Sequence, residues 1–367
     1  MNKILSGLLA LSTGLGLAAR LTAAETPPVP GASSQPAAVS AVPASASTAP
    51  AVAPAADRAA PDATQAPTPA APAGATPAAT QPAEQVQVLH FDTPDAAALA
   101  LIEAAAATGP EALLAILGPD LTELVSGDPV ADAADRRWFV ENARLSAQIE
   151  DEHPDFALMV IGPDNWPFPI PLLKDEGGWY FDTAAGRDEV LNRRIGRNEL
   201  FTLAAMRAFV QAQGEYAAAD PQRLGRPVFA DRILSNPGQK DGLYWPTAAG
   251  EPPSPLGPLV AEAVAMGYDA SPPTQGPRPF HGYLYKILTA QGDQSPGGAM
   301  SYRQDGRLIQ GFGLLAWPAS YGYSGIMTFL VNQRGLVHEK DLGEDTATLA
   351  PGIEAYNPGE GWRVVAE

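Results

Sequence analysis

The chain of 367 residues has no cysteine and only four histidines. Without cysteine it has no disulfide, no thiolate nucleophile, no metal site built on sulfur and no lipid-bearing N-terminal cysteine. The histidines form neither H-E-x-x-H nor H-x-x-E-H, the patterns of zinc hydrolases; they are His90, His153, His281 and His338. We therefore expect no metal site and no cofactor.

Basic residues are also scarce. The chain has 23 Lys and Arg against 41 Asp and Glu, which gives a net charge of −18. Binding to a phosphate backbone needs a basic stripe, and none is present, so nucleic acid is not an expected partner. An anionic membrane surface is disfavoured for the same reason. The sequence also contains no P-loop, dinucleotide-binding fingerprint or EF-hand loop.

Aromatic residues are absent before Phe91, and two segments of different composition fill this part. Residues 1–24 begin with a short polar stretch containing Lys3, continue as an apolar run and end in small residues, the layout of a secretory signal peptide. The apolar run is shorter than the roughly 20 residues that span a bilayer. We expect export, cleavage after Ala24 and a soluble periplasmic protein with no later transmembrane segment.

The second segment, residues 25–86, consists mostly of Ala, Pro, Ser and Thr and holds 13 of the 38 prolines. Such a composition cannot bury enough apolar surface to offset the entropy of ordering the chain. The sequence predicts a disordered, partly polyproline-like linker here.

Residues 87–188 are predicted to form a first α+β domain with three helices followed by three short strands. Thr93 as N-cap and Pro94 in the first turn predict the first helix. Gly118 is expected to end the second helix. The third helix is predicted to include 128–150, with Phe139 and Leu145 on its apolar face. The strands are predicted in "DFALMVIG", "WPFPIPLLK" and "GGWYFDT".

Residues 189–367 are predicted to form a second α+β domain, a long helix lying on an antiparallel sheet. Leu200, Leu203, Met206 and Val210 share one helical face, which we expect to be core. The strands are predicted in "HGYLYKIL", "LIQGFGLLAWP", "GIMTFLVN", "LVHEKDL" and the tail "GWRVVAE". The helix either continues from the preceding segment or meets a second helix at Gly196.

Several motifs in one order carry a resemblance to a known family. They are "WPFPIPLLK", "RRIGRNEL", "DGLYWP", "HGYLYKIL", "SPGGAMSY", "GFGLLAWPASYGYSGIMTFLVN" and "KDLG". From roughly Phe91 to the C-terminus the chain resembles a family of bacterial envelope proteins, domain of unknown function 2950. The resemblance implies an exported protein, and it brings no catalytic residues to this sequence.

A second resemblance concerns the C-terminal half. The helix "AAMRAFVQAQGEYAAAD" and the later strands "GYLYKI" and "GLLAWPASYGYSGIMTFLVNQRGLV" resemble the head of type IV pilins and pseudopilins. This resemblance implies a helix packed on an antiparallel sheet. The sequence departs from pilins because a linker and another domain stand where a pilin has its apolar assembly helix.

Candidate binding residues gather in aromatic and glycine-rich loops. The loop "SPGGAMS" is either an anion-binding nest of backbone amides or a plain hairpin turn. Tyrosine and tryptophan side chains suit glycan or peptide recognition, although ordinary packing would also explain them. The predicted ligand-binding residues are Asp241, Tyr244, Trp245, His281, Tyr283, Gly297, Gly298, Tyr321 and Tyr323.

The sequence leaves three functions open. The first is a non-catalytic envelope module that binds an envelope protein, a peptide or a glycan. The second is an envelope hydrolase that uses His281 with a serine or carboxylate of the same domain. Ser324 does not lie in the G-x-S-x-G elbow of serine hydrolases. The third is a pilin-like structural subunit.

Overall fold

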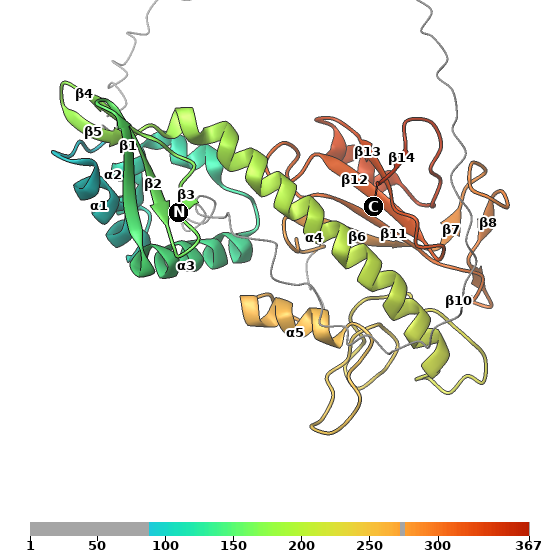
Figure 1. Cartoon of the computed structure of the whole chain (residues 1–367). Coiled ribbons are helices and arrows are strands. Elements are labelled where there is room, and N and C mark those ends of the chain that lie inside the picture. The colour runs from blue at the N-terminus through green and yellow to red at the C-terminus, as the bar shows by residue number, and fades with distance from the viewer. Residues whose placement is uncertain (1–87, 272–275, 367) are drawn as a thin grey trace, which may run out of the picture. The chain divides into compact units, whose positions relative to one another are not determined.

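The computed structural model describes residues 88–271 and 276–366 (Figure 1). The predicted signal peptide at 1–24 and the predicted linker at 25–86 lie outside the described residues. The fold is α+β as predicted. The described residues belong to one compact unit, within which separate hydrophobic cores form before and after the middle of the long helix α4. Among the described helices, none combines the length and apolar composition needed to cross a membrane.

The N-terminal half consists of helices packed on a small antiparallel sheet. Its helices are α1 (Pro94–Ala106), α2 (Glu111–Leu117), the 3-10 helix η1 (Pro119–Leu124) and α3 (Pro129–Leu145). Its strands are β1 (Ala147–His153), β2 (Phe156–Ile161), β3 (Trp166–Pro167), β4 (Leu172–Asp175) and β5 (Gly178–Phe181). In the sheet the strand order is β1-β2-β4-β5, and the short strand β3 also pairs with β2. The strands predicted in "DFALMVIG" and "GGWYFDT" are confirmed as β2 and β5, whereas "WPFPIPLLK", predicted as one strand, is divided into β3 and β4.

Local signals set most of the helix ends. The Thr93 hydroxyl accepts a hydrogen bond from the amide of Ala96, as expected of an N-cap. Gly118 ends α2 with a φ of 74°. The third helix was predicted too long, because it ends at Leu145 and the chain continues as β1. β1 pairs with β2 in an antiparallel hairpin, and this pairing overrides the helical pattern. Leu145 is 75% exposed, so its predicted place in the core was wrong.

Helix α4 (Thr183–Ala219) is one continuous helix of 37 residues, which settles the alternative of a break at Gly196. The apolar face predicted for it was partly wrong. Met206 is fully buried, but Leu200 is 67% exposed. The buried face is instead partly polar, since it includes Thr202 and Gln213. The Gln213 side chain both donates to the carbonyl and accepts from the amide of Ala230, so burial leaves its polar atoms satisfied.

The C-terminal half places a five-stranded antiparallel sheet against α4. The strands are β6 (Tyr283–Leu288), β11 (Gly313–Pro318), β12 (Met327–Asn332), β13 (His338–Asp341) and β14 (Arg363–Val364), in the order β14-β13-β12-β11-β6. Smaller elements are β7 (Ala290–Gln291), β8 (Met300–Ser301), β9 (Arg303–Gln304), β10 (Arg307–Leu308), α6 (Thr346–Leu349) and the 3-10 helix η2 (Ala350–Gly352). Most of the predicted strands, including the C-terminal edge strand, are confirmed, but "LIQGFGLLAWP" is not one strand, since residues 309–312 separate β10 from β11.

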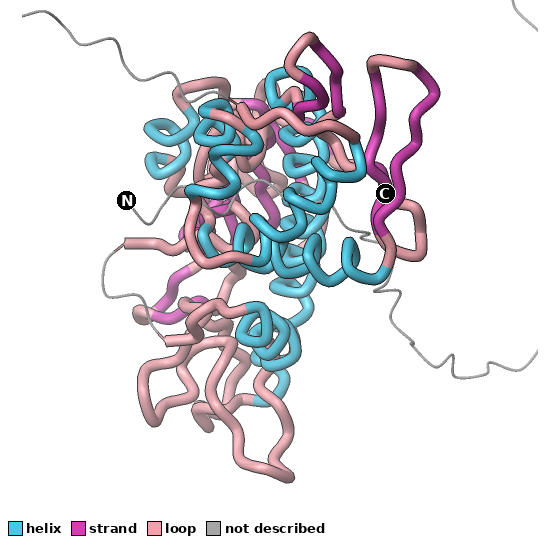
Figure 2. Tube along the Cα trace, turned by 90° about the vertical axis from the view of Figure 1, so that its left-hand side faces the viewer, coloured by secondary structure: helices cyan, strands magenta, loops and turns pink. Residues whose placement is uncertain are grey.

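The segment between α4 and α5 (Gly257–Met266) forms loops, which occupy the bottom of the view in Figure 2. The pattern of "FADRILSNPGQKDGLYWP" predicts a short helical turn within a loop. No such turn forms there, and backbone bridges from Phe229 to Leu308 and from Leu234 to Tyr244 hold the start of this stretch extended.

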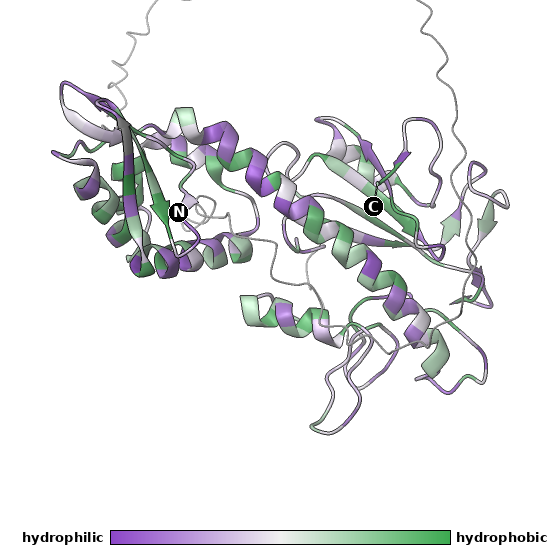
Figure 3. Cartoon of the chain, viewed as in Figure 1, coloured by the Kyte–Doolittle hydropathy of each residue, from purple (hydrophilic) through white to green (hydrophobic). Residues whose placement is uncertain are grey.

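Both faces of the central strands are covered, and these strands are among the most hydrophobic parts of the chain (Figure 3). Phe329 and Val331 belong to the core beneath α4, whereas Leu330 belongs to a separate core with Ala350 and Tyr356. The side chains of "GIMTFLVN" therefore alternate between the two faces of the sheet, as expected of a strand.

The glycines of α4 give a test of its packing and continuity. A Cβ at Gly186 would lie 2.7 Å from the Cα of Ile170, whereas Gly196 and Gly214 have open space. We expect Gly186→Ala to lower the free energy of unfolding by about 1–3 kcal/mol. Gly196→Ala and Gly214→Ala should each raise it by up to about 1 kcal/mol, since alanine favours helix. Urea unfolding measures these changes, and a destabilising Gly196→Ala would contradict a continuous helix.

Candidate functional site

The predicted binding residues lie in several separate surroundings. Asp241 lines a polar pocket, and Tyr244 and Trp245 pack against the core beneath α4. His281 and Tyr283 are buried. Tyr321 and Tyr323 lie in the turn before β12, and Gly297 and Gly298 lie in the β7–β8 hairpin. Within the described residues, no hydrogen bond or ring contact joins the hairpin glycines to the aromatic residues of this group.

The side chain of Gln291 fills the interior of the glycine-rich loop. Its amide donates to the carbonyl oxygens of Pro296 and Gly298, at 3.2 Å and 2.8 Å. The amide of Gly298 donates to the carbonyl of Ser295. Gly297 and Gly298 have φ values of 101° and 75°, which only glycine adopts readily. Turn geometry therefore accounts for both glycines without a ligand.

Contacts within the protein hold the side chains of Tyr283 and Tyr321, and Tyr323 lies in a turn. Tyr283 is fully buried, and its hydroxyl donates to the carbonyl of Met327 at 3.0 Å. The Tyr321 hydroxyl donates to Asp341 at 3.3 Å, and the amide of Tyr323 closes a turn on Ser320.

His281 is held neutral inside the protein. It is 5% exposed, and its ring stacks on that of Phe201 with centroids 4.1 Å apart and an angle of 8° between planes. Burial, with a smaller contribution from the positive charge of Arg197, lowers the pKa of His281 to about 4. Within the described residues the ring makes no hydrogen bond to a serine or a carboxylate. The contacts thus supply none of the partners that the hydrolase hypothesis requires.

Asp128, which sequence reasoning missed, organises the region around His281. It is 1% exposed. Its Oδ1 accepts from the amides of Val130 and Ala131 and so caps α3. Its Oδ2 accepts from the hydroxyl of Tyr268 at 2.8 Å and from the amide of Gly282 at 3.1 Å. One carboxylate therefore fastens α3, the end of the α5 segment and the start of β6 together.

Two further carboxylates of α3 face arginines of α4. The Ser126 hydroxyl donates to Asp132, and burial raises the pKa of Asp132 to about 7. Asp135 makes a two-pronged ion pair with Arg197, at 2.9 Å and 3.1 Å. Arg194 is 1% exposed and donates to the carbonyl of Leu124. The spacing of the aspartates, at intervals of four and three residues, is the helical signal that would have revealed this cluster.

A pocket lies beneath α5. Its volume is about 710 Å³, and it opens to solvent. Side chains from α4, α5, β6 and β11 line it, and most are apolar, including Phe209, Leu259, Val260, Ala263, Ile287 and Leu314. A few polar groups join them, among them Asp128 and Tyr268. We call this space the apolar pocket.

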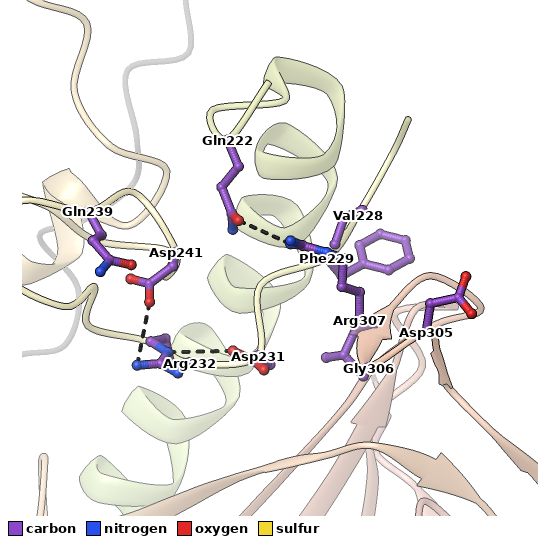
Figure 4. A pocket seen from close by; sticks show the side chains of 11 residues that line it. Gln222, Val228, Phe229, Asp231, Arg232, Gln239, Asp241, Asp305, Gly306 and Arg307 are labelled. Carbon is purple, nitrogen blue, oxygen red and sulfur yellow. Dashed lines mark hydrogen bonds and ion pairs between the residues drawn. The ribbon is translucent and has the colours of Figure 1, made fainter. Parts of the chain in front are cut away.

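A second pocket of about 370 Å³, the polar pocket, lies between the loops that follow α4 and the β9–β10 hairpin. Figure 4 shows the Arg232 guanidinium between the carboxylates of Asp231 and Asp241. Both ion pairs are long, at 3.5 Å. Arg307 reaches across to Gln222, to which it donates at 3.1 Å. Of the predicted binding residues, Asp241 alone lines either pocket.

A family described as "Protein of unknown function (DUF2950)" matches residues 88–365. The chain belongs to the DUF2950 family. The DUF2950 region covers both pockets and the Asp128 cluster. No curated protein and no solved structure matches the chain. The resemblance to pilin heads therefore stays a prediction.

The buried carboxyl of Asp132 should make stability depend on pH. Between pH 3.8, the ordinary pKa of an aspartate, and about 7, the folded protein keeps a proton that the unfolded chain has lost. The free energy of unfolding should therefore fall as pH rises through this window, by up to about 1.4 kcal/mol per pH unit, and level off above it. Asp132→Asn removes this dependence, so its stability relative to wild type should increase with pH.

Urea unfolding at several pH values measures the effect. Asp305→Asn, at a side chain that is 70% exposed, is the matched control and should follow the wild-type curve. Equal pH slopes for Asp132→Asn and wild type would contradict the assignment.

Proposed function

We propose that this DUF2950 protein is an exported, non-catalytic binding module of the bacterial envelope. In this proposal its ligand places an apolar group in the apolar pocket. The observation that carries the proposal is the pocket itself, a space of about 710 Å³ with a mainly apolar lining open to solvent.

The size and composition of the pocket support ligand binding. Sites for small molecules are commonly clefts of about 300–1,000 Å³, with apolar walls and a few fixed polar groups. Here the polar groups are held rigidly. Burial, together with the negative charge of Asp128, raises the pKa of Tyr268 above its usual range, so its hydroxyl keeps its proton and donates to that carboxylate.

The lining favours an apolar ligand group over a sugar ring. Leu259, Val260 and Ala263 form one wall, and Phe209 belongs to the opposing helix α4. Val264 on the same wall is 48% exposed, although it is a large apolar residue. Removing this surface from water would contribute about 25 cal/mol for each Å² covered, which gives a ligand with apolar groups a driving force for binding.

Export rests on the signal-peptide pattern of residues 1–24 and on the resemblance to envelope proteins. The hydrolase alternative is less well supported, because the His281 ring is stacked against Phe201 and, within the described residues, makes no hydrogen bond to a serine or a carboxylate. A non-catalytic binding function needs a ligand pocket but no catalytic residues, so the apolar pocket is sufficient for it.

Filling the pocket should abolish binding of an apolar reporter. Ala263 lines the pocket and is 9% exposed. We expect Ala263→Phe to weaken binding of the fluorescent probe N-phenyl-1-naphthylamine by about tenfold or more, because the added ring occupies the ligand's space. Fluorescence titration measures the affinity.

The matched control is Ala265→Phe on the same helix, at an exposed position outside the pocket lining. It should bind the probe as wild type does, and circular dichroism should show both variants folded. The proposal fails if wild type does not bind the probe, or if both variants bind it equally.

A further inference from the structure

The two pockets share a wall. Asp231 and Arg232 line both the apolar pocket and the polar pocket. A ligand whose apolar part lies beneath α5 can therefore reach the polar pocket at these two residues. Arg232 keeps 43% of its side chain exposed, and its ion pairs are long, so several of its N–H groups remain free to donate to a ligand.

The carboxylates of the polar pocket are already paired with guanidinium groups. Asp231 lies 3.5 Å from Arg232 and 3.2 Å from Arg303. Asp241 lies 3.5 Å from Arg232, and Asp305 lies 3.8 Å from Arg226. A cationic ligand group would have to displace one of these pairs, and an anionic group that approached Arg232 or Arg307 would also meet the neighbouring aspartates.

Hydroxyl groups suit this lining better. A hydroxyl donates to an aspartate oxygen and accepts from an arginine N–H, so it adds hydrogen bonds without breaking the ion pairs. Gln239 is exposed in the same lining, and its amide offers one acceptor and two donors. The net charge of −18 further disfavours an anionic ligand.

We propose that the ligand is an amphiphile with an uncharged, polyhydroxylated head. Its apolar chain lies in the apolar pocket, and its head lies in the polar pocket against Asp231, Arg232 and Asp241. This inference rests on the proposed function, since it requires that the apolar pocket bind the chain.

Three probes with the same alkyl chain and different heads test the inference. They are n-dodecyl-β-maltoside, dodecyl sulfate and dodecyltrimethylammonium, each titrated calorimetrically below its micelle concentration into the exported, signal-free protein. The maltoside should bind about tenfold more tightly than either charged probe. Equal or tighter binding of a charged probe would overturn the inference.

The variant Arg232→Leu tests the site proposed for the head separately from the site proposed for the alkyl chain. Loss of the guanidinium should weaken maltoside binding about tenfold and should strengthen binding of the cationic probe, because Asp231 and Asp241 lose their shared partner. The matched control is Arg187→Leu. Arg187 is 42% exposed and paired with Glu123, and it lines neither pocket. This control should bind the maltoside as wild type does, and an Arg232→Leu variant that also does so would contradict the assigned head site.

The failure of this inference differs from failure of the proposed function. If N-phenyl-1-naphthylamine binds wild type but not Ala263→Phe, while the maltoside binds no better than the charged probes, only the hydroxylated head is wrong. If neither the naphthylamine nor any alkyl probe binds, the apolar pocket is not a binding site and both proposals fall.

Discussion

The buried carboxylate of Asp128 is the interaction on which the middle of this structure depends. A carboxylate at 1% exposure is costly unless donors surround it. Two amides of α3, the hydroxyl of Tyr268 and the amide of Gly282 supply those donors. Because these donors belong to segments far apart in the sequence, satisfying one side chain fixes α3, the chain after α5 and the turn that opens β6. Asp128 also lines the apolar pocket, so the same side chain connects these segments and contributes to the proposed binding site.

The long helix α4 contributes side chains to two hydrophobic cores and to the apolar pocket. Its first half contributes Val190 to the N-terminal core, and its second half contributes Met206 and Phe209 to the core beneath the sheet. Between them, Arg194 and Arg197 face the carboxylates of α3. Helix α5 is held through few polar contacts, such as the donation from the Arg137 guanidinium to the carbonyl of Met266. The apolar pocket lies beneath this helix, where the core is open to solvent.

Much of the fold could be predicted from local patterns, and little of the site could. Thr93 and Gly118 mark helix ends by capping chemistry that acts within a few residues. The alternation in β12 likewise predicts which side chains share a face. In contrast, the helical pattern of residues 128–150 extends into β1, which forms a strand because it pairs with β2. The predicted residues were drawn from aromatic loops, and Tyr283 proved to be core. The pockets are assembled from positions between Asp128 and Leu314, whose proximity arises only from the tertiary fold.

The most direct test locates the ligand. Methyl NMR of leucine- and valine-labelled protein, titrated with dodecyl maltoside, reports on each apolar side chain separately. We expect the methyl signals of Leu259, Val260 and Leu314, which line the apolar pocket, to shift with one common affinity. Leu145 and Leu349, exposed at 75% and 50%, should stay unchanged because they lie outside it. Shifts confined to Leu145 and Leu349, or spread evenly over all five, would contradict a binding site beneath α5.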